Sequence, residues 1–264
     1  MIKMIASDLD GTLIPEGTQE MEDGFMDVLG ELLERGYEFC AASGRQYANM
    51  RRVFEEYQDR IGFVCENGAL VMEHGTIQYA QKLPRELVSE VAEDIMRFPC
   101  TDIMLSGVKA CYIQPRTPWY ENQITHVLKN ETRVFQNFSE IDDTIVKIAM
   151  YVYDFPQNIE SIRSFMEEKY GTLADFLCAG NDWFDMIMKG SGKGTGLRAY
   201  IEKKGIRSDE IMAFGDNQND ISMLELTPHS YAMAHSTPEV RSHAGHVCTS
   251  VTQTLRAFLD TELS

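Results

Sequence analysis

Short apolar runs alternate with segments of helical spacing at the start of the chain. Residues Lys3–Ser7, Glu38–Ala42 and Gly62–Cys65 have the length and composition of buried strands. Apolar side chains recur every three or four residues through Met21–Arg35, and Gly36 follows directly, which predicts a helix that ends there. Strands that alternate with helices in this way are typical of βαβ units, so we expect a parallel sheet.

The middle of the chain follows a different order. Residues Ala69–Met72 and Thr76–Tyr79 flank Glu73-His74-Gly75 and predict a hairpin. Beyond Pro84 the expected helices and strands no longer alternate regularly, which indicates a separate α+β module. Its expected elements are helices at Arg85–Arg97, Trp119–Lys129 and Asn158–Tyr170 and strands at Ile103–Leu105, Cys111–Gln114, Val146–Val152, Leu173–Cys178 and Trp183–Ile187.

Regular alternation resumes at Gly190. We expect a helix at Gly194–Lys204, a strand at Ile211–Phe214 and a closing helix at Gln253–Leu263. The fold class is therefore predicted to be α/β. A Rossmann-like parallel-sheet core, residues 1–83 and 189–264, is interrupted by an inserted α+β cap domain, residues 84–188.

Composition narrows the classes of function. The chain has 264 residues, of which 44% are hydrophobic and 25% charged, as in ordinary globular proteins. Its net charge of -17 disfavours nucleic acid and anionic membranes as partners, because both require clustered Lys and Arg. The sequence contains no apolar run of about 18 residues, and early carboxylates leave no space for a signal peptide. We expect a cytoplasmic protein with reduced cysteines, as a monomer or weak homo-oligomer.

A first candidate for chemistry is the segment Asp8-Leu9-Asp10-Gly11-Thr12, which follows the first expected strand. In an open α/β sheet, ligands bind at the carboxyl ends of the strands. Two carboxylates at such a place can divide the work, since one can attack phosphorus while the other moves protons. An acidic cap before a turn explains the same residues equally well, so this segment alone does not decide.

Two further loops offer groups that bind an anion. Ser43 and Gly44, followed by Arg45, present a hydroxyl and backbone N–H groups after the second expected strand. Lys193 lies in the glycine-rich segment Gly190–Gly194 and offers a positive charge to a phosphate. Taken singly, a capped turn and a flexible linker explain these two segments better.

The loop from Gly215 to Asp220 indicates a metal site. It follows an expected strand, and its carboxylates and amides suit a hard cation that binds oxygen. The alternative is an Asx-rich turn that caps the next helix, but the two carboxylates Asp216 and Asp220 favour the metal. Together the loops supply a nucleophile, an acid–base group, a hydroxyl, a cation and metal ligands, which are the groups that phosphoryl transfer requires.

This combination resembles the haloacid dehalogenase superfamily, in its Cof-type class with a large α/β cap (subclass IIB). The motifs that begin at Asp8 and Ser43, then Lys193, then the loop from Gly215 to Asp220, occur in the family order along the whole chain. Glu66-Asn67-Gly68-Ala69 is similar to the segment that precedes the cap insertion.

Two segments depart from the family pattern. Met233-Ala234-His235-Ser236 stands where the family commonly has Met-Gly-Asn-Ala, and Ser250-Val251-Thr252-Gln253 replaces an acidic-Gly-Val turn. Both lie outside the four motifs, so the catalytic groups that the resemblance implies are all present.

The resemblance implies a Mg²⁺-dependent phosphatase in which Asp8 forms an aspartyl phosphate. Asp10 would protonate the leaving oxygen and then activate water; such an acid favours a phosphate ester over a haloacid, because halide leaves unprotonated. The Mg²⁺ ligands would be the Asp8 carboxylate, the Asp10 carbonyl and Asp216, with Asp220 in support. The remaining groups would hold phosphate, namely Ser43, Gly44, Lys193 and Asn219, with Thr12 and Arg45 as supporting residues.

Several alternatives stay open. A sugar phosphate is the favoured substrate, with a nucleotide or pyridoxal phosphate as alternatives. As alternatives to a phosphatase, a phosphomutase or phosphotransferase would use the same core, and a catalytically dead protein would bind ligand without reaction. His235, His243 and His246 are expected to be loop histidines rather than a second metal site. In the cap, Arg116, Trp119 and Tyr120 either touch substrate or pack against the sheet of the cap.

Overall fold

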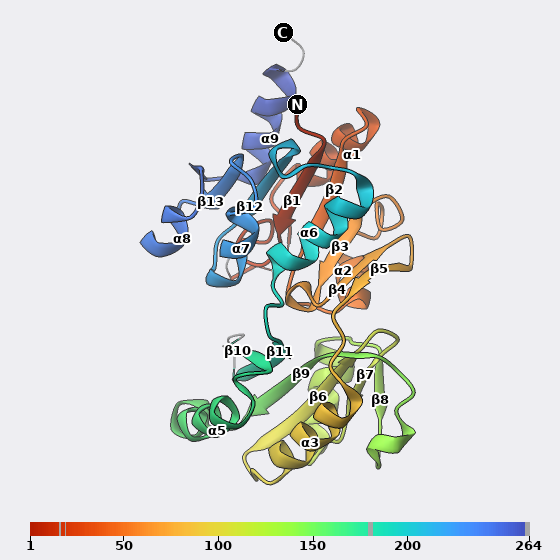
Figure 1. The fold of residues 1–264 in the computed structure, drawn as a ribbon. Helices are drawn as coiled ribbons and strands as arrows, with labels where there is room; N and C mark the ends of the chain where they lie inside the picture. The colour runs from red at the N-terminus through yellow and green to blue at the C-terminus, as the bar shows by residue number, and fades with distance from the viewer. Residues whose placement is uncertain (16, 19, 179–181, 262–264) are drawn as a thin grey trace. The chain divides into compact units, whose positions relative to one another are not determined.

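The computed structural model describes residues 1–15, 17–18, 20–178 and 182–261, and the chain forms two compact units (Figure 1). One unit, which we call the core, comprises Met1–Tyr79 and Gly192–Ser264. The other, which we call the cap, comprises Ala80–Ser191. These limits lie close to the expected ones, 79 against 83 at the first junction and 192 against 189 at the second.

The core is built on an eight-stranded sheet with the order β14-β13-β12-β1-β2-β3-β4-β5. The pairs from β14 through to β3 are parallel, whereas β3 and β4 are antiparallel. The strands are β1 (Met4–Asp8), β2 (Glu38–Ala42), β3 (Gly62–Cys65), β4 (Leu70–Glu73), β5 (Thr76–Ala80), β12 (Ile211–Gly215), β13 (Ser230–Met233) and β14 (His246–Cys248). Since β1 lies between β12 and β2, its carboxyl end has parallel neighbours on both sides.

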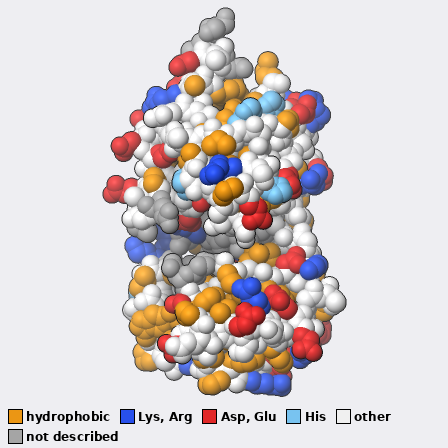
Figure 2. All heavy atoms as spheres, turned by 90° about the vertical axis from the view of Figure 1, so that its left-hand side faces the viewer, with side chains coloured by type: hydrophobic (Ala, Val, Ile, Leu, Met, Phe, Trp, Pro, Cys, Tyr) orange, Lys and Arg blue, Asp and Glu red, His pale blue; other side chains and the backbone are white. Residues whose placement is uncertain are grey.

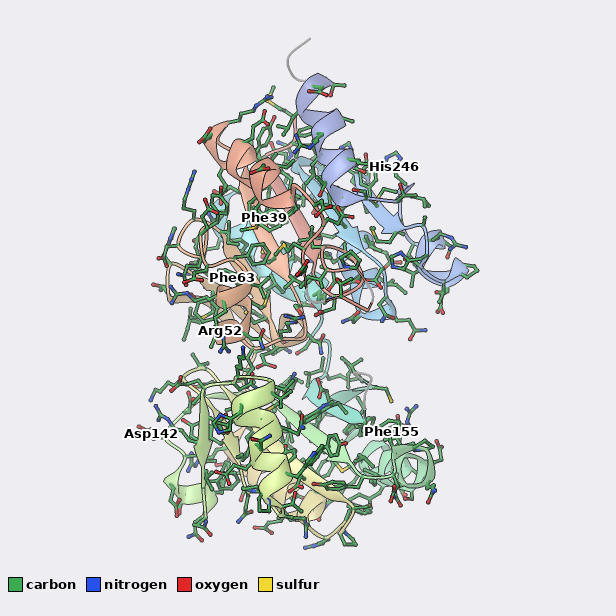
Figure 3. All side chains as sticks on the ribbon, turned by 180° about the vertical axis from the view of Figure 1, so that it is seen from behind. Phe39, Arg52, Phe63, Asp142, Phe155 and His246 are labelled. Atoms are coloured by element: carbon green, nitrogen blue, oxygen red, sulfur yellow. The ribbon has the colours of Figure 1, made fainter. Side chains whose placement is uncertain are left out.

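Helices cover both faces of the core sheet. On one face, Leu197 and Ile201 of α6 pack with Met4 and Ala6 of β1. On the other face, the Phe39 ring lies 5.7 Å from the ring of Phe25 in α1. Figure 3 shows the molecule from behind, with Phe39 labelled. The core helices are α1 (Phe25–Glu34), α2 (Tyr47–Val53), α6 (Lys193–Lys204), α7 (Ile221–Leu224), α8 (Pro238–Ser242) and α9 (Val251–Thr261). A parallel sheet buried on both faces is the predicted α/β architecture, and that prediction is confirmed.

The cap is built on a six-stranded sheet with the order β10-β11-β9-β6-β7-β8. All of its pairs are antiparallel except β7 with β8. The strands are β6 (Thr101–Gly107), β7 (Cys111–Ile113), β8 (Thr132–Val134), β9 (Ile145–Val152), β10 (Ala174–Cys178) and β11 (Trp183–Met188).

Alternate side chains of the cap strands enter two different clusters. Ile103 and Leu105 of β6 pack in the large cluster formed with α3 (Arg85–Met96) and α5 (Phe155–Tyr170). Met104, between them, packs instead with Tyr120 of α4 (Pro118–Asn122). The two longer helices therefore cover one face of the cap sheet, and α4 lies on the other.

The sequence prediction was wrong in three places. The expected helix Trp119–Lys129 is the short α4 followed by a π-helical turn, Gln123–Val127. The short strand β8 was not expected. Helix α1 begins at Phe25 rather than Met21, because Gly24 is in the left-handed region at φ 73°. The expected end of the last helix, Leu263, lies outside the described residues.

Charged side chains of both signs are present on the molecular surface (Figure 2). Figure 2 shows one face, on which Lys and Arg side chains are scattered among acidic ones rather than gathered into a basic patch. Within the residues that the structure describes, no helix is both long enough and apolar enough to cross a bilayer.

Candidate active site

A buried lysine joins two carboxylates at the carboxyl end of β1. Asp8 is the last residue of that strand, and its side chain is only 4% exposed. Lys193, the first residue of α6, donates to Asp8 Oδ1 at 2.5 Å and to Asp220 Oδ1 at 2.6 Å. Lys193 is 1% exposed and Asp220 is fully buried, so three charged groups share one site shielded from water.

A close backbone contact positions Lys193. Gly68 has φ +90°, and a Cβ added there would lie 1.9 Å from the carbonyl oxygen of Gly192. Only glycine permits the backbone of this loop to approach the start of α6 so closely. The chain that follows β3 thus fixes where the lysine enters the site.

The loop after β12 holds the second and third carboxylates. Asp220 Oδ2 accepts from the backbone N–H groups of Asp216 and Asn217, both at 3.0 Å, which fixes the turn. Thr12 donates from Oγ1 to Asp216 Oδ1 at 2.9 Å. A Cβ at Gly11, which has φ +91°, would lie 2.4 Å from Asp216 Oδ2, so the loops after β1 and β12 are in direct contact.

The charges of this cluster do not balance. Burial and the Asp220 carboxylate raise the pKa of Asp8 well above its ordinary value, and Lys193 opposes that rise. Burial and Asp220 also raise the pKa of Asp216. For Lys193, burial lowers the pKa, but Asp220 and Asp8 outweigh burial and raise it. Three carboxylates therefore face one ammonium group, which leaves an excess of negative charge.

This excess fits a divalent cation. Oxygens of Asp8, Asp216 and Asp220 lie within 4.8 Å of one another. Asp8 Oδ2 is buried and has no hydrogen-bond partner among the described residues, which is costly unless another group binds it. Carboxylate oxygens are the donors that Mg²⁺ prefers, so the donor set suits the predicted ion. The Asp10 carboxylate is not one of the three.

The Asp10 carboxylate is exposed and forms an ion pair with Arg45, whose Nε donates to Oδ2 at 2.9 Å. Ser43 is buried, and its Oγ accepts from the backbone N–H of Arg45 at 3.2 Å. The segment after β2 therefore reaches the segment after β1, as the expected grouping of the loops requires.

Asn67 connects two of the predicted phosphate-binding segments. Its Oδ1 accepts from Asn219 Nδ2 at 3.2 Å, and a Cβ on Gly44 would lie 3.0 Å from the same oxygen. Asn67 is buried and has φ 54°, a left-handed conformation that asparagine tolerates better than most residues. Sequence reasoning placed Asn67 in a family-like segment but gave it no role.

His235, expected from the sequence to be a loop histidine, does lie in a loop, and that loop is near the carboxylate cluster. Its Nε2 lies 3.9 Å from Asp216 Oδ2, in the loop that follows β13. The rule that ligand-binding loops follow parallel strands could have found it. The other two histidines lie elsewhere, since His243 contacts Glu225 at 2.7 Å and the His246 ring stacks on Tyr231 at 4.8 Å.

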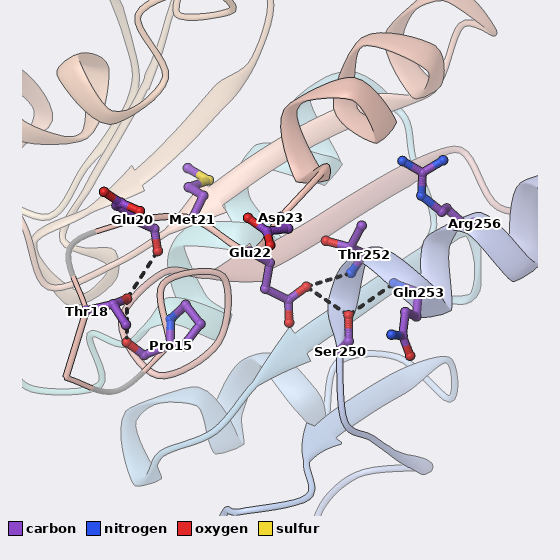
Figure 4. A pocket seen from close by; sticks show the side chains of 10 residues that line it. All are labelled: Pro15, Thr18, Glu20, Met21, Glu22, Asp23, Ser250, Thr252, Gln253 and Arg256. Carbon is purple, nitrogen blue, oxygen red and sulfur yellow. Dashed lines mark hydrogen bonds between the residues drawn. The ribbon is translucent and has the colours of Figure 1, made fainter.

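Figure 4 shows a different pocket in the core, of about 600 Å³. None of the predicted site residues lines this pocket. Glu22 accepts there from Ser250 Oγ at 3.0 Å and from the Thr252 N–H at 2.9 Å, and so caps the N-terminus of α9. The contacts of Glu22 explain this region as a helix cap.

The match to a family model extends over residues 5–254 and is described as haloacid dehalogenase-like hydrolase. The chain belongs to the haloacid dehalogenase-like hydrolases. The predicted superfamily is confirmed, and so is the prediction of an enzyme of hydrolase type. The match includes both core segments and the whole cap, so the family assignment does not depend on the core motifs alone.

Relatives of this hydrolase include named phosphatases. The chain is 28% identical over 235 residues to the 5-amino-6-(5-phospho-D-ribitylamino)uracil phosphatase YbjI of Escherichia coli, with 89% of this chain and 86% of that one covered. The crystal structure of SMU.1108c from Streptococcus mutans superposes with a TM-score of 0.83 at 26% identity, covering 98% and 100% of the two chains. The subclass IIB sugar phosphatase BT4131 shares the fold, with a TM-score of 0.78 at 21% identity over 97% and 98%. The phosphatase class expected from the sequence agrees with these relatives.

Proposed function

We propose that this hydrolase is a Mg²⁺-dependent phosphatase that cleaves small phosphate esters with Asp8 as its nucleophile. The observation that carries the proposal is the buried bridge from Lys193 to Asp8 and Asp220 beside Asp216. A charged cluster of this kind is expensive to bury and indicates a catalytic role. The unpartnered Asp8 Oδ2 is the oxygen left available for chemistry.

In the proposed reaction, an Asp8 oxygen attacks phosphorus, and the bond from phosphorus to the ester oxygen breaks. Asp10 gives a proton to that oxygen, and the alcohol leaves. Asp10 then takes a proton from water, which attacks phosphorus and releases Asp8 and inorganic phosphate. The Asp10 carboxyl group is exposed, so it can exchange protons with solvent, and its ion pair with Arg45 fixes its position.

The remaining residues bind and orient the transferred group. Lys193 offers its ammonium charge, while Ser43 Oγ and the Gly44 N–H are the proposed donors to phosphate oxygens. Asn219 is oriented by Asn67. Asp8, the Asp10 carbonyl and Asp216 would hold Mg²⁺, with Asp220 in support; when bound, the ion would neutralise charge on the phosphoryl oxygens.

For the substrate we propose a small phosphorylated metabolite with a sugar-like phosphate end. The name of the Escherichia coli relative, which specifies a phosphoribityl group, supports this choice, as does the subclass IIB sugar phosphatase with the same fold. The cap is proposed to select the leaving group and exclude water. A cytoplasmic location is part of the proposal, because such metabolites occur there.

The test is release of inorganic phosphate from a panel of sugar phosphates, nucleotides and pyridoxal phosphate. We expect turnover that requires Mg²⁺, is abolished by EDTA and falls at least about 10³-fold in Asp8→Asn, because the amide cannot form the covalent intermediate. Equal turnover by Asp8→Asn would reject Asp8 as nucleophile. Isomerised sugar phosphate without free phosphate would instead identify a mutase.

A further inference from the structure

One edge of the cap sheet carries an exposed strand. Strand β8 (Thr132–Val134) is the last strand on its side of the sheet, and among the strands that the structure describes it pairs with β7 alone (Figure 1). Thr132 is half-buried, whereas Arg133 and Val134 are exposed. An edge strand presents a row of backbone N–H and C=O groups to which a strand of another chain can pair.

The pairing of β8 with β7 decides which backbone groups face the open edge. The Cys111 N–H of β7 donates to the Glu131 carbonyl at 2.8 Å, and Cys111 lies in register with Thr132. Alternate residues of a strand direct their backbone groups to the same side, so those of Glu131 and Arg133 face β7. The N–H and C=O groups of Thr132 and Val134 therefore point to the open edge.

Exposed apolar side chains concentrate beside this edge. Val127 is 56% exposed, Leu128 38% and Val134 47%, and these are three of the eight large apolar residues that are exposed among those described. Val134 lies in register with Ile113, which packs in one cluster with Ile124 of the π-helical turn, so this turn and Val134 share a face of the sheet. Apolar side chains that gather in this way indicate an interaction surface, whereas scattered ones do not.

Two charged side chains lie on the other face of the same edge. Arg133 lies in register with Tyr112, which packs in the large cap cluster with α3 and α5. Glu131 comes two positions before Arg133, and both residues are exposed. Side chains at alternate positions of an extended chain share a face, so a negative and a positive group stand on either side of Thr132. Opposite charges placed about a central residue make the edge complementary to a second copy of itself.

We propose that β8 pairs with β8 of a second copy of this chain, antiparallel across a two-fold axis at Thr132. In this register Glu131 of each copy faces the partner's Arg133, so the axis generates two ion pairs. An axis at Arg133 places two like charges opposite each other, which is unfavourable. The net charge of -17 opposes association in general, so a dimer requires local attraction of this kind. The inference uses cap residues only and does not depend on the proposed function.

The first test measures molar mass by sedimentation equilibrium over a series of protein concentrations. The paired segment is short compared with the interfaces of stable dimers, so we expect a dissociation constant of roughly 10–1,000 µM. Glu131→Arg or Arg133→Glu alone makes like charges face each other twice, and each should weaken the dimer at least about tenfold. Glu160→Arg is the matched control, because it makes the same change in net charge at an exposed position of α5, and it should dimerise as the wild type does. A monomer at every concentration up to about 1 mM, or a dimer that neither reversal weakens, would overturn the proposal.

The second test combines the two charge reversals. Glu131→Arg leaves two arginines at the edge and Arg133→Glu leaves two glutamates, so each variant repels itself but matches the other. An equimolar mixture should form a heterodimer at concentrations where each variant alone is monomeric. The chain that carries both reversals should regain the wild-type dissociation constant to within about threefold. Since both side chains are exposed, every variant should keep the wild-type urea midpoint of tryptophan emission, which shows that the cap is folded. A mixture that stays monomeric, or a double reversal that does not dimerise, would overturn the proposed pairing.

Discussion

Replacing Lys193 with methionine tests whether the charged cluster is as buried as described. Methionine keeps most of the side-chain volume but leaves the carboxylates of Asp8 and Asp220 without the ammonium that they share at 2.5 and 2.6 Å. Removing one partner of a buried ion pair costs about 3–5 kcal/mol, against about 0–1 kcal/mol for an exposed pair. With an m-value of about 2 kcal/mol/M, the urea midpoint of the core should fall by roughly 1.5–2.5 M.

A second substitution, Asp220→Asn, should change the stability of the core in opposite directions depending on the residue at position 193. In the wild-type background Asp220→Asn removes a partner of Lys193 and should destabilise the core. In the Lys193→Met background the same change removes one of two uncompensated carboxylates and should stabilise it. The asparagine oxygen can still accept from the two backbone N–H groups that Asp220 binds, so the turn is retained.

Two spectroscopic signals distinguish unfolding of the core from unfolding of the cap. Both tryptophans lie in the cap, so their emission follows unfolding of that unit, whereas far-UV circular dichroism follows both. Urea titrations in EDTA should show a lower midpoint for the dichroism of Lys193→Met and an unchanged midpoint for its emission. A decrease of less than about 1 kcal/mol in the free energy of unfolding of Lys193→Met would refute the buried cluster. A stability change of the same sign for Asp220→Asn in both backgrounds would refute it as well.

Two further predictions concern one residue in each unit. Gly68→Ala should destabilise the core by about 1–3 kcal/mol from backbone strain at positive φ alone, and the Cβ contact with a carbonyl oxygen at 1.9 Å should add to this loss. Gly75→Ala is the control, because Gly75 also has positive φ, +70°, but a Cβ there would have no atom within 4 Å. In the same urea titration, Gly75→Ala should show only the loss of free energy of unfolding that comes from backbone strain. In the cap, burial raises the pKa of Asp94, but hydrogen bonds from Lys169 and Tyr170 outweigh it and hold that pKa below its ordinary value. The stabilisation by ionised Asp94 is therefore complete above about pH 4 and declines as the pH falls through the lowered pKa of Asp94. Asp94→Asn should lower the thermal midpoint of tryptophan emission more at pH 7 than near pH 3, and an equal loss at both would contradict the sign.

The sequence was sufficient for elements whose burial is uniform. Strands β2 and β3 occur at the residues expected, Glu38–Ala42 and Gly62–Cys65, because strands covered on both faces form continuous apolar runs. The short strand β8 was not predicted, because Thr132-Arg133-Val134 is largely exposed and does not form a continuous apolar run. The length of helix α4 was predicted wrongly for another reason. The prediction assumed one uniform helical period through Trp119–Lys129, whereas the chain changes to a π-helical turn at Gln123.

The grouping of the candidate residues in space was predictable from the sequence, but their individual contacts were not. Order along the strands indicated that Asp8, Lys193 and Asp216 would gather at one sheet edge. It did not indicate that Asn67 would join Asn219, because that contact depends on a left-handed asparagine that no spacing rule reveals. His235 was expected to be a loop histidine, and the sequence did not predict the 3.9 Å distance between its Nε2 and Asp216 Oδ2.

The central place of β1 has a consequence for biosynthesis. Its hydrogen-bonding neighbour β12 belongs to the later core segment, so a ribosome that has made residues 1–79 has produced an open sheet edge with no partner strand. The edge stays unpaired while the ribosome synthesises Ala80–Ser191, which takes roughly 6 to 22 s at 5–20 residues per second. The cap is one continuous stretch and can acquire its structure during this interval. We therefore expect nascent chains of this protein to depend on chaperones most strongly just before β12 leaves the exit tunnel.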